Sequence, residues 1–237
     1  MTPKSTTTDT RWIKESSFGV WFLGTETWET HVLTRALDDL ERLMHTDRSY
    51  ETILDIGYGH GQSVRMLDQR FHPQRIIGLD IDPDARLKSA DNIHQCQCQV
   101  DLIQANANAI ALGDETVDMI FCHQTFHHLV DQDNAIKEFK RVLKPGGVLL
   151  FAESCRKYIH SFIIKLLFRH PMDVQKTDQE YIELVKSAGF IVDEKSVSRP
   201  YLWWSRLDLG ILEKVARKKP AKNREETMIN LVAYREE

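Results

Sequence analysis

The 237-residue sequence predicts an α/β protein built on a doubly wound, mainly parallel sheet. Short apolar runs alternate with longer amphipathic stretches from residue 52 onward, and this pattern is typical of consecutive βαβ units. A glycine-rich turn directly follows the first apolar run, where such sheets commonly bind a ligand. Because the crossovers between parallel strands are right-handed, we expect helices on both faces of the sheet.

The first half of the predicted sheet contains five strands, all short and rich in aliphatic or β-branched residues. They cover residues 52–56, 75–80, 100–104, 117–122 and 148–153. Amphipathic stretches at 62–70, 84–93 and 133–143 are predicted to be helices, the second capped by Asp82 or Asp84. Pro145 and Gly146 follow the helix predicted at 133–143 and end it, because proline and glycine stop helices.

The pattern changes after the fifth strand. Residues 158–168 have a wide apolar helical face, 178–188 form an amphipathic helix ended by Gly189, and strands are expected at 190–197 and 227–234. A segment rich in proline and tryptophan and then in basic residues lies between these strands and is predicted to be an insertion. Residues 12–43 are expected to be mostly helical. We predict a single domain with an N-terminal helical cap (1–50) and two halves, 51–153 and 154–237.

The composition argues against several classes of protein. The chain is 42% hydrophobic and 28% charged with a net charge of −4, so nothing draws it to nucleic acid. No apolar run is long enough for a membrane span, and the polar first nine residues do not resemble a signal peptide. Four cysteines without a secretory signal predict free thiols and a cytoplasmic location. A homodimer is allowed by these observations.

The most informative segment is the run ILDIGYGHG at residues 53–61. It combines a strand, a glycine turn with the spacing G-x-G-x-G, and the start of a helix. Glycines permit a tight turn and a close approach of a ligand to bare backbone. An acidic residue, Asp55, lies two positions before the first glycine.

A second acidic residue, Asp80, ends the second predicted strand. In a doubly wound sheet this position lies beside the glycine turn, and a carboxylate there can accept hydrogen bonds from both ribose hydroxyls. The turn does not have the pyrophosphate-binding spacing of dinucleotide sites. The predicted ligand is therefore a nucleoside attached to a small or cationic group, rather than NAD.

Four ordered motifs resemble those of the class I S-adenosylmethionine-dependent methyltransferases, and the small-molecule enzymes related to quinone biosynthesis are the most similar subgroup. The motifs are LDIGYGHG at 54–61, GLDID at 78–82, VDMIFCHQTFHHL at 117–129 and EFKRVLKPGGVLLFAE at 138–153. The resemblance implies a Rossmann-like sheet of seven strands, mostly parallel, whose antiparallel last strand lies between the fifth and sixth. It makes 51–153 the cofactor-binding half and 154–237 the substrate-side half.

The resemblance also assigns cofactor-binding roles. The methionine part of S-adenosylmethionine would lie among Asp55, Gly57, Tyr58, Gly59 and Gly61, with His123 and Gln124 flanking its sulfonium end. Asp80 would bind the ribose hydroxyls, and Ile81 would pack against the adenine. Asn106 and Ala107 would lie at the adenine edge. The family usually has aspartate where this chain has Asn106, and the asparagine carbonyl can still accept a hydrogen bond from the adenine amino group.

Candidates for catalysis and acceptor binding lie at the carboxyl ends of the strands. His127 and His128 follow the fourth strand, and each is interpreted either as a general base or as a packing residue. The substrate-side candidates are Glu153, Arg156 and His160, together with Trp21 and Trp204 in a predicted aromatic lid. Glu153 could instead cap the next helix.

No metal site is predicted, because His94, Cys96 and Cys98 alternate without a fourth ligand. The predicted activity is methyl transfer from S-adenosylmethionine to a small, partly hydrophobic acceptor. Oxygen or carbon is favoured because the sequence lacks an Asn/Asp-Pro-Pro-aromatic tetrapeptide. The alternatives are a methyltransferase acting on RNA or protein, a non-catalytic S-adenosylmethionine-binding module, and a nucleotide-dependent oxidoreductase, against which the turn spacing argues.

Overall fold

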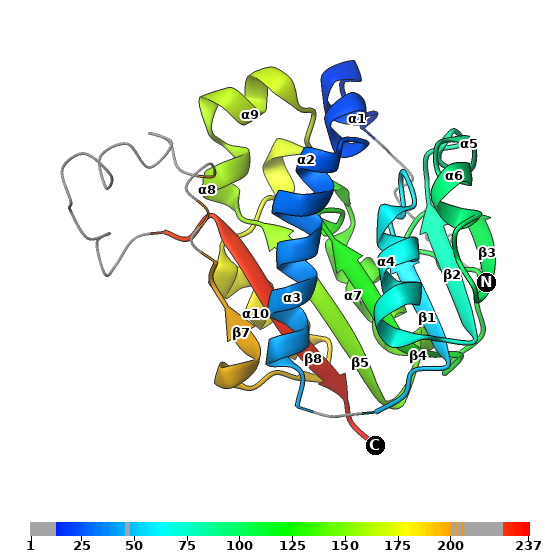
Figure 1. Ribbon diagram of the computed structural model, residues 1–237. Coiled ribbons are helices and arrows are strands. Elements are labelled where there is room, and N and C mark those ends of the chain that lie inside the picture. Colours follow the sequence, from blue (N-terminus) through cyan, green and yellow to red (C-terminus); the bar gives the residue numbers. More distant parts are fainter. Residues whose placement is uncertain (1–12, 46–47, 201, 203–204, 206–224) are drawn as a thin grey trace, which may run out of the picture.

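The computed structural model describes residues 13–45, 48–200, 202, 205 and 225–237. One sheet crosses the molecule in the order β3-β2-β1-β4-β5-β8-β6, and β7 also pairs with β8 (Figure 1). The eight strands are β1 (Thr52–Ile56), β2 (Arg75–Asp80), β3 (Gln99–Gln104), β4 (Val117–His123), β5 (Leu143–Ser154), β6 (Phe190–Ile191), β7 (Val197–Ser198) and β8 (Met228–Arg235).

The strand directions confirm the predicted fold class. β1 to β5 are mutually parallel, whereas β8 runs antiparallel to β5 and lies between β5 and β6. The single strand expected at 190–197 is instead two short strands, β6 and β7, separated by a 3-10 turn at Glu194–Ser196. The polar residues 193–196 interrupt the apolar pattern there, so the chain leaves the sheet and then returns to β8.

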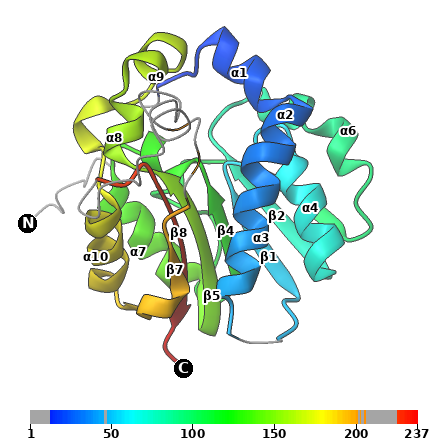
Figure 2. The same cartoon turned by 60° about the vertical axis from the view of Figure 1, so that its left-hand side comes forward.

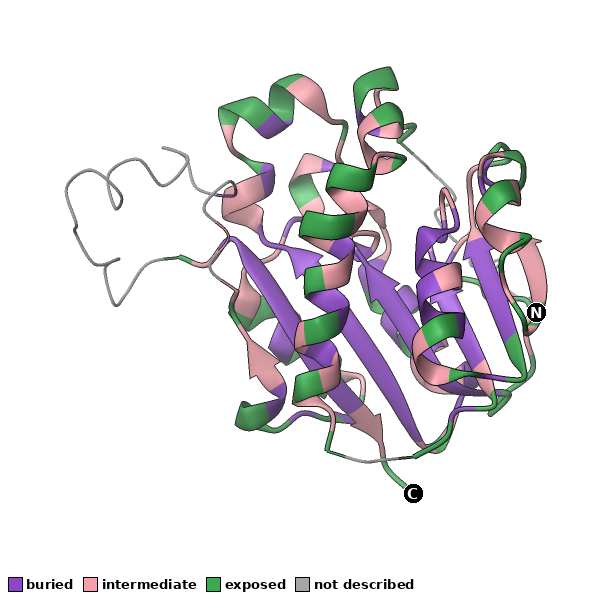
Figure 3. Cartoon of the chain, in the orientation of Figure 1, coloured by how far each residue is buried: buried purple, intermediate pink, exposed green. Residues whose placement is uncertain are grey.

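Helices cover both faces of the sheet. Leu37 of α3 (Thr34–Leu43) and Val64 of α4 (Gln62–Phe71) share one buried cluster with β1 and β4. Phe139 of α7 (Gln132–Val142) and Tyr181 of α10 (Asp178–Ser187) share the other. Figure 2 shows the two pairs of helices on opposite sides of the sheet, and Figure 3 shows that the central strands are buried.

Two predicted helices are each divided in two. The helix expected at 84–93 is α5 (Ala85–Lys88) and α6 (Ala90–Ile93), joined at the fully buried Ser89. Asp84 provides no side-chain cap, whereas the Asp82 carboxylate accepts from the Asp84 N–H at 3.0 Å. The helix expected at 158–168 is α8 (Arg156–Ile159) and α9 (Phe162–Leu167).

The N-terminal stretch is mostly helical, as predicted. It contains α1 (Ser17–Leu23), α2 (Glu26–Trp28) and a π-helical turn (Glu29–Leu33) that continues into α3. Figure 1 shows α1, α8 and α9 at the same end of the sheet. Among the described helices, none has the length and apolar character needed to cross a membrane.

Candidate functional site

The loop after β1 leaves backbone bare where the sequence predicts a ligand. Gly57 has φ +76°, and a Cβ there would lie 2.2 Å from Thr125 Oγ1, so this glycine is required for packing. Gly59 has φ +46°, and a Cβ there would meet only the Gly57 carbonyl oxygen at 3.9 Å. A side chain at residue 59 would therefore extend into open space beside the loop, which glycine leaves free for a ligand.

Gly61 was predicted to contact the cofactor, but it is packed against another segment of the chain. A Cβ at Gly61 would lie 2.9 Å from Ser89 Cβ, and Gly61 does not line the adjoining cavity. Its φ of +79° starts α4. The third glycine of the motif thus allows α4 to pack closely against the buried turn between α5 and α6.

The Asp80 carboxylate lies beside the glycine loop, as predicted. It accepts hydrogen bonds from the backbone N–H of Gly59 at 2.9 Å and of Asp82 at 2.8 Å. Burial raises the pKa of Asp80 above its usual value. Asp82 forms an ion pair with Lys88 at 2.6 Å. These contacts fix the position of the Asp80 carboxylate at the end of β2.

The Asp55 carboxylate is buried behind the same loop. Its Oδ2 accepts a hydrogen bond from Ser63 Oγ at 2.5 Å. Removal from water disfavours the charged form, and burial raises the pKa of Asp55 to about 7 despite the serine hydrogen bond. Asp55 is therefore a carboxyl group that changes charge near neutral pH.

A cavity of about 190 Å³ lies over the glycine loop. All the predicted cofactor residues except Gly61 line it. They are Asp55, Gly57, Tyr58, Gly59, Asp80, Ile81, Asn106, Ala107, His123 and Gln124. The ends of β1, β2 and β4 and the turn after β3 therefore meet at one site, as the carboxyl ends of parallel strands should.

Two polar side chains at the end of β4 have unsatisfied atoms. The buried Nε2 atoms of His123 and Gln124 have no hydrogen-bond partner within the described chain. Gln124 has φ +51°, and its Oε1 accepts from Ser154 Oγ at 2.5 Å. Burial lowers the pKa of His123 to about 3, so its imidazole is neutral. Buried polar atoms usually have partners, so unsatisfied donors and acceptors beside a cavity indicate a ligand site.

A second cavity of about 480 Å³ adjoins the first. Leu23, Trp28, Gln124 and His128 line both cavities, so the two spaces meet there. The apolar lining of the second comes mainly from α1, α2 and α9 and includes Phe18, Phe22, Ile163, Leu167 and Phe168. An apolar cavity of this size is typical of a small-molecule site.

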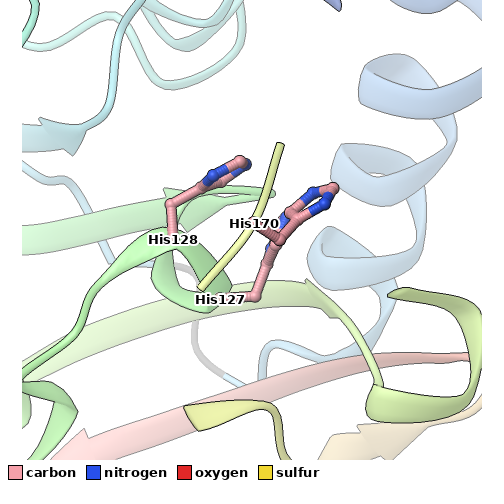
Figure 4. Close-up of side chains that lie close together, drawn as sticks. All are labelled: His127, His128 and His170. Carbon is pink, nitrogen blue, oxygen red and sulfur yellow. The ribbon is translucent and has the colours of Figure 1, made fainter. Parts of the chain in front are cut away.

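Three histidines lie together in the larger cavity, and one of them, His128, also lines the first cavity. The ring centroids of His127 and His128 are 4.3 Å apart, and His170 lies 5.1 Å and 4.6 Å from them, respectively (Figure 4). All three line the larger cavity. Burial lowers the pKa of His128 well below its usual value and that of His170 to about 3, so both rings are neutral.

Glu153 was predicted to face the acceptor, and the structure places it elsewhere. Its fully buried Oε1 accepts from the backbone N–H of Thr125 at 2.9 Å and of Phe126 at 2.6 Å, while Oε2 lies 2.6 Å from His127 Nδ1. The carboxylate neither lines a cavity nor caps α8. It binds the turn after β4 and orients His127.

Of the four other substrate-side candidates, three line neither cavity and one lies outside the described residues. Arg156 lies outside both cavities and pairs with Glu180 at 3.4 Å, and the exposed His160 lies 3.3 Å from the Met172 carbonyl oxygen. Trp21 is 64% exposed and lines neither cavity, because Phe18 and Phe22 occupy the inward side of α1. Trp204 lies outside the described residues.

Several functional candidates were missed by sequence reasoning. Trp28, His31 and Arg35 line the larger cavity from the helical segment before the sheet, and His170 reaches it from the loop after α9. The spacing of residues 28, 31 and 35 on one helical face is the signal that could have identified the first three. No local pattern identifies His170, because only the tertiary structure brings it to His128.

The first cavity fits a nucleoside with a cationic substituent. Bare backbone at Gly59 adjoins the Asp80 carboxylate, and unsatisfied polar atoms lie at the end of β4. Carboxylates at Asp55 and Asp80 would favour a cation.

Comparison with known proteins agrees with this geometry. The model of a methyltransferase domain family matches residues 54–151. An uncharacterized methyltransferase-like protein of Schizosaccharomyces pombe is 37% identical over 58% of this chain and 53% of its own length. The trans-aconitate 2-methyltransferase of an Azoarcus species is 35% identical over 49% of this chain and 44% of its own length. A malonyl-[acyl-carrier protein] O-methyltransferase of Coxiella burnetii is 31% identical over 48% of this chain and 37% of its own length. The chain thus spans about half or less of the length of these relatives.

Solved structures show the same fold. A chain of the complex between the Haloferax volcanii Trm112 methyltransferase activator and a methyltransferase superposes with a TM-score of 0.70 at 20% identity, covering 93% of this chain and 96% of that one. An S-adenosylmethionine-dependent methyltransferase from Aquifex aeolicus gives 0.64 at 18% identity, covering 91% and 96%.

Proposed function

We propose that this chain, whose residues 54–151 match a methyltransferase domain family, is a class I S-adenosylmethionine-dependent methyltransferase that transfers the cofactor's methyl group to a small, partly hydrophobic acceptor. The observation that supports this proposal is the 480 Å³ apolar cavity beside the cofactor cavity. The two cavities share Trp28, Gln124 and His128, so an acceptor in the larger one would meet the cofactor at that boundary. The subgroup related to quinone biosynthesis stays a prediction.

The cofactor would be held by the loops after β1, β2, β3 and β4. Asp80 would accept from the ribose hydroxyls, Ile81 and Asn106 would meet the adenine, and Asp55 would face the cationic methionine end. S-adenosylmethionine supplies an electrophilic methyl group attached to a sulfonium, so the protein mainly orients the acceptor and excludes water.

Oxygen is the favoured methyl acceptor. His128 lies at the junction with His127 beside it in the larger cavity, and an imidazole ring nitrogen can take the proton of an acceptor hydroxyl. Arg35 lines the same cavity, and its guanidinium would suit an acceptor with an anionic group. Two relatives are named for methylation of malonyl-[acyl-carrier protein] and trans-aconitate, which supports a small acid-bearing acceptor.

Methyl transfer is tested with radiolabelled S-adenosylmethionine and a panel of hydrophobic hydroxy and carboxylic acids. We expect label in the organic extract. Replacing Phe168 by alanine should raise KM for the best acceptor about tenfold and leave cofactor affinity unchanged, because Phe168 lines only the acceptor cavity. Trp21→Ala is the control and should change neither value, since Trp21 lines neither cavity. Label in RNA or protein instead, or cofactor binding without any transfer, would contradict the proposal.

Cofactor affinity should depend on pH through Asp55. Its pKa of about 7 in the free protein means that the carboxyl is mostly protonated at pH 6. A bound cation favours the charged carboxylate and lowers this pKa, so binding below pH 7 must release a proton. We expect the Kd for S-adenosylmethionine to rise by up to about tenfold per pH unit from pH 7 to pH 5.

Calorimetry across that pH range tests the dependence. In Asp55→Asn the Kd for S-adenosylmethionine should be higher than in the wild type at pH 8, and it should stay nearly constant from pH 8 to pH 5. Asp101→Asn should retain the wild-type profile, because Asp101 pairs with Arg75 outside the cavity. A pH profile that survives in Asp55→Asn would assign the proton to another group.

A further inference from the structure

The three histidines that line the larger cavity form a group with the composition of a metal site. Within the described part of the chain, His127, His128 and His170 each bring a ring nitrogen within 4.8 Å of the other two (Figure 4). They come from two segments, the 3-10 turn Phe126–His128 after β4 and the loop after α9. Imidazole suits zinc and other divalent transition metals.

Two buried side chains hold this group in place. Glu153 Oε2 lies 2.6 Å from His127 Nδ1, which fixes the ring and leaves Nε2 as the free nitrogen. The Gln175 amide donates to the backbone carbonyl oxygen of His127 at 2.8 Å and to that of Pro171, which follows His170, at 2.7 Å. Gln175 therefore ties together the two segments that carry the histidines.

We propose that His127, His128 and His170 bind one divalent transition-metal ion, with Zn²⁺ preferred, and leave one coordination position open to the apolar cavity. Three protein ligands and an open fourth position are typical of zinc sites that act on substrates rather than of structural ones. A carboxylate that receives the second ring N–H of a ligating histidine, as Glu153 does from His127, is the usual outer partner in such sites.

Coordination of a single ion requires the rings to move closer together and to turn. With Zn–N bonds of about 2.0–2.1 Å, nitrogens in a tetrahedral site lie roughly 3.4 Å apart, whereas the three here lie within 4.8 Å of one another. The planes of the stacked His128 and His170 rings are 28° apart, so both rings must turn to direct a nitrogen at the same ion as His127. The site itself does not depend on the proposed methyl transfer.

The three histidines suit a metal ion better than the thiols of Cys96 and Cys98, which alternate with His94 in the sequence. The Cys96 and Cys98 side chains are not grouped with any third ligand among the described residues. Burial raises the pKa of these thiols to about 11 and 12, so they are protonated at neutral pH. A thiol must lose its proton to bind a metal, so these two cysteines are poor candidates for ligands.

The test measures metal binding directly. The full chain, stripped with a chelator, is titrated with ZnCl₂ by calorimetry, and with Co²⁺ while the visible absorption is recorded. We expect one equivalent to bind with a Kd of about 1 μM or tighter. His128→Ala and His170→Ala should each weaken binding at least tenfold, and Glu153→Gln should weaken it about 10–100-fold.

Matched variants separate this site from adventitious binding. His31→Ala, in the same cavity, and the double variant Cys96→Ser with Cys98→Ser should keep the wild-type Zn²⁺ affinity. Circular dichroism and S-adenosylmethionine binding show whether each variant is folded. The proposal is overturned if the folded wild type binds no Zn²⁺ below about 100 μM, or if affinity persists in His128→Ala and His170→Ala. Methyl transfer by stripped protein would leave the proposed function intact, whatever the outcome for the metal.

Discussion

Replacing Asp80 by alanine should weaken S-adenosylmethionine binding about 100-fold or more. The Asp80 carboxylate is held by the N–H groups of Gly59 and Asp82, so it is in place before a ligand arrives. A hydrogen bond to a charged group contributes about 1.5–3 kcal/mol, and Asp80 would accept two from the ribose while keeping the loop in position. Asp80→Asn should lose less affinity for S-adenosylmethionine, because the amide oxygen can still accept a hydrogen bond from the ribose. Calorimetric titration with S-adenosylmethionine and S-adenosylhomocysteine measures both effects.

Asp101→Ala is the matched control for Asp80. It removes an exposed carboxylate that pairs with Arg75 across neighbouring strands and does not line the cavity. Wild-type affinity in this variant would show that the loss in Asp80→Ala does not arise from net charge. Unchanged affinity in a folded Asp80→Ala protein would refute the ribose assignment.

In the metal-free protein, in which His127 Nε2 is not engaged by an ion, replacing Glu153 by glutamine should lower kcat about 100-fold and leave cofactor affinity within about twofold. The amide oxygen can still accept from the N–H groups of Thr125 and Phe126, so the turn after β4 keeps its anchor. The amide nitrogen would then face His127 Nδ1, which must become an acceptor. The ring proton moves to Nε2, and the nitrogen that faces the acceptor loses its lone pair. General bases typically contribute about 10²–10⁴-fold to the rate.

Nitrogen-15 shifts of the His127 ring distinguish this change from a simple loss of stability, because the two tautomers have different shifts. Glu183→Gln, on the exposed side of α10, is the control and should leave kcat and the His127 tautomer unchanged. A wild-type kcat in Glu153→Gln, with the tautomer inverted, would show that His127 Nε2 takes no part in the reaction.

The cofactor half of the site could be predicted from the sequence because it depends on local patterns. Gly57, Gly59 and Asp80 each stand at the end of a strand, and parallel strands bring their carboxyl ends to one edge. The loops that carry these residues therefore lie at the same edge of the sheet. Gly61 differs from the other two glycines, because its small size allows packing against Ser89 and it does not line the cavity.

The acceptor half was determined by the tertiary structure. Glu153 follows the same strand-end rule as Asp80, yet its side chain turns inward to two backbone N–H groups and His127. Trp21 and Trp28 are both tryptophans of the helical segment before the sheet, but of the two only Trp28 lines the cavities. His170 joins His127 and His128 because Gln175 ties two segments distant in sequence. The direction of a side chain and the meeting of remote loops depend on three-dimensional packing, whereas strand order and turn type are encoded in neighbouring residues.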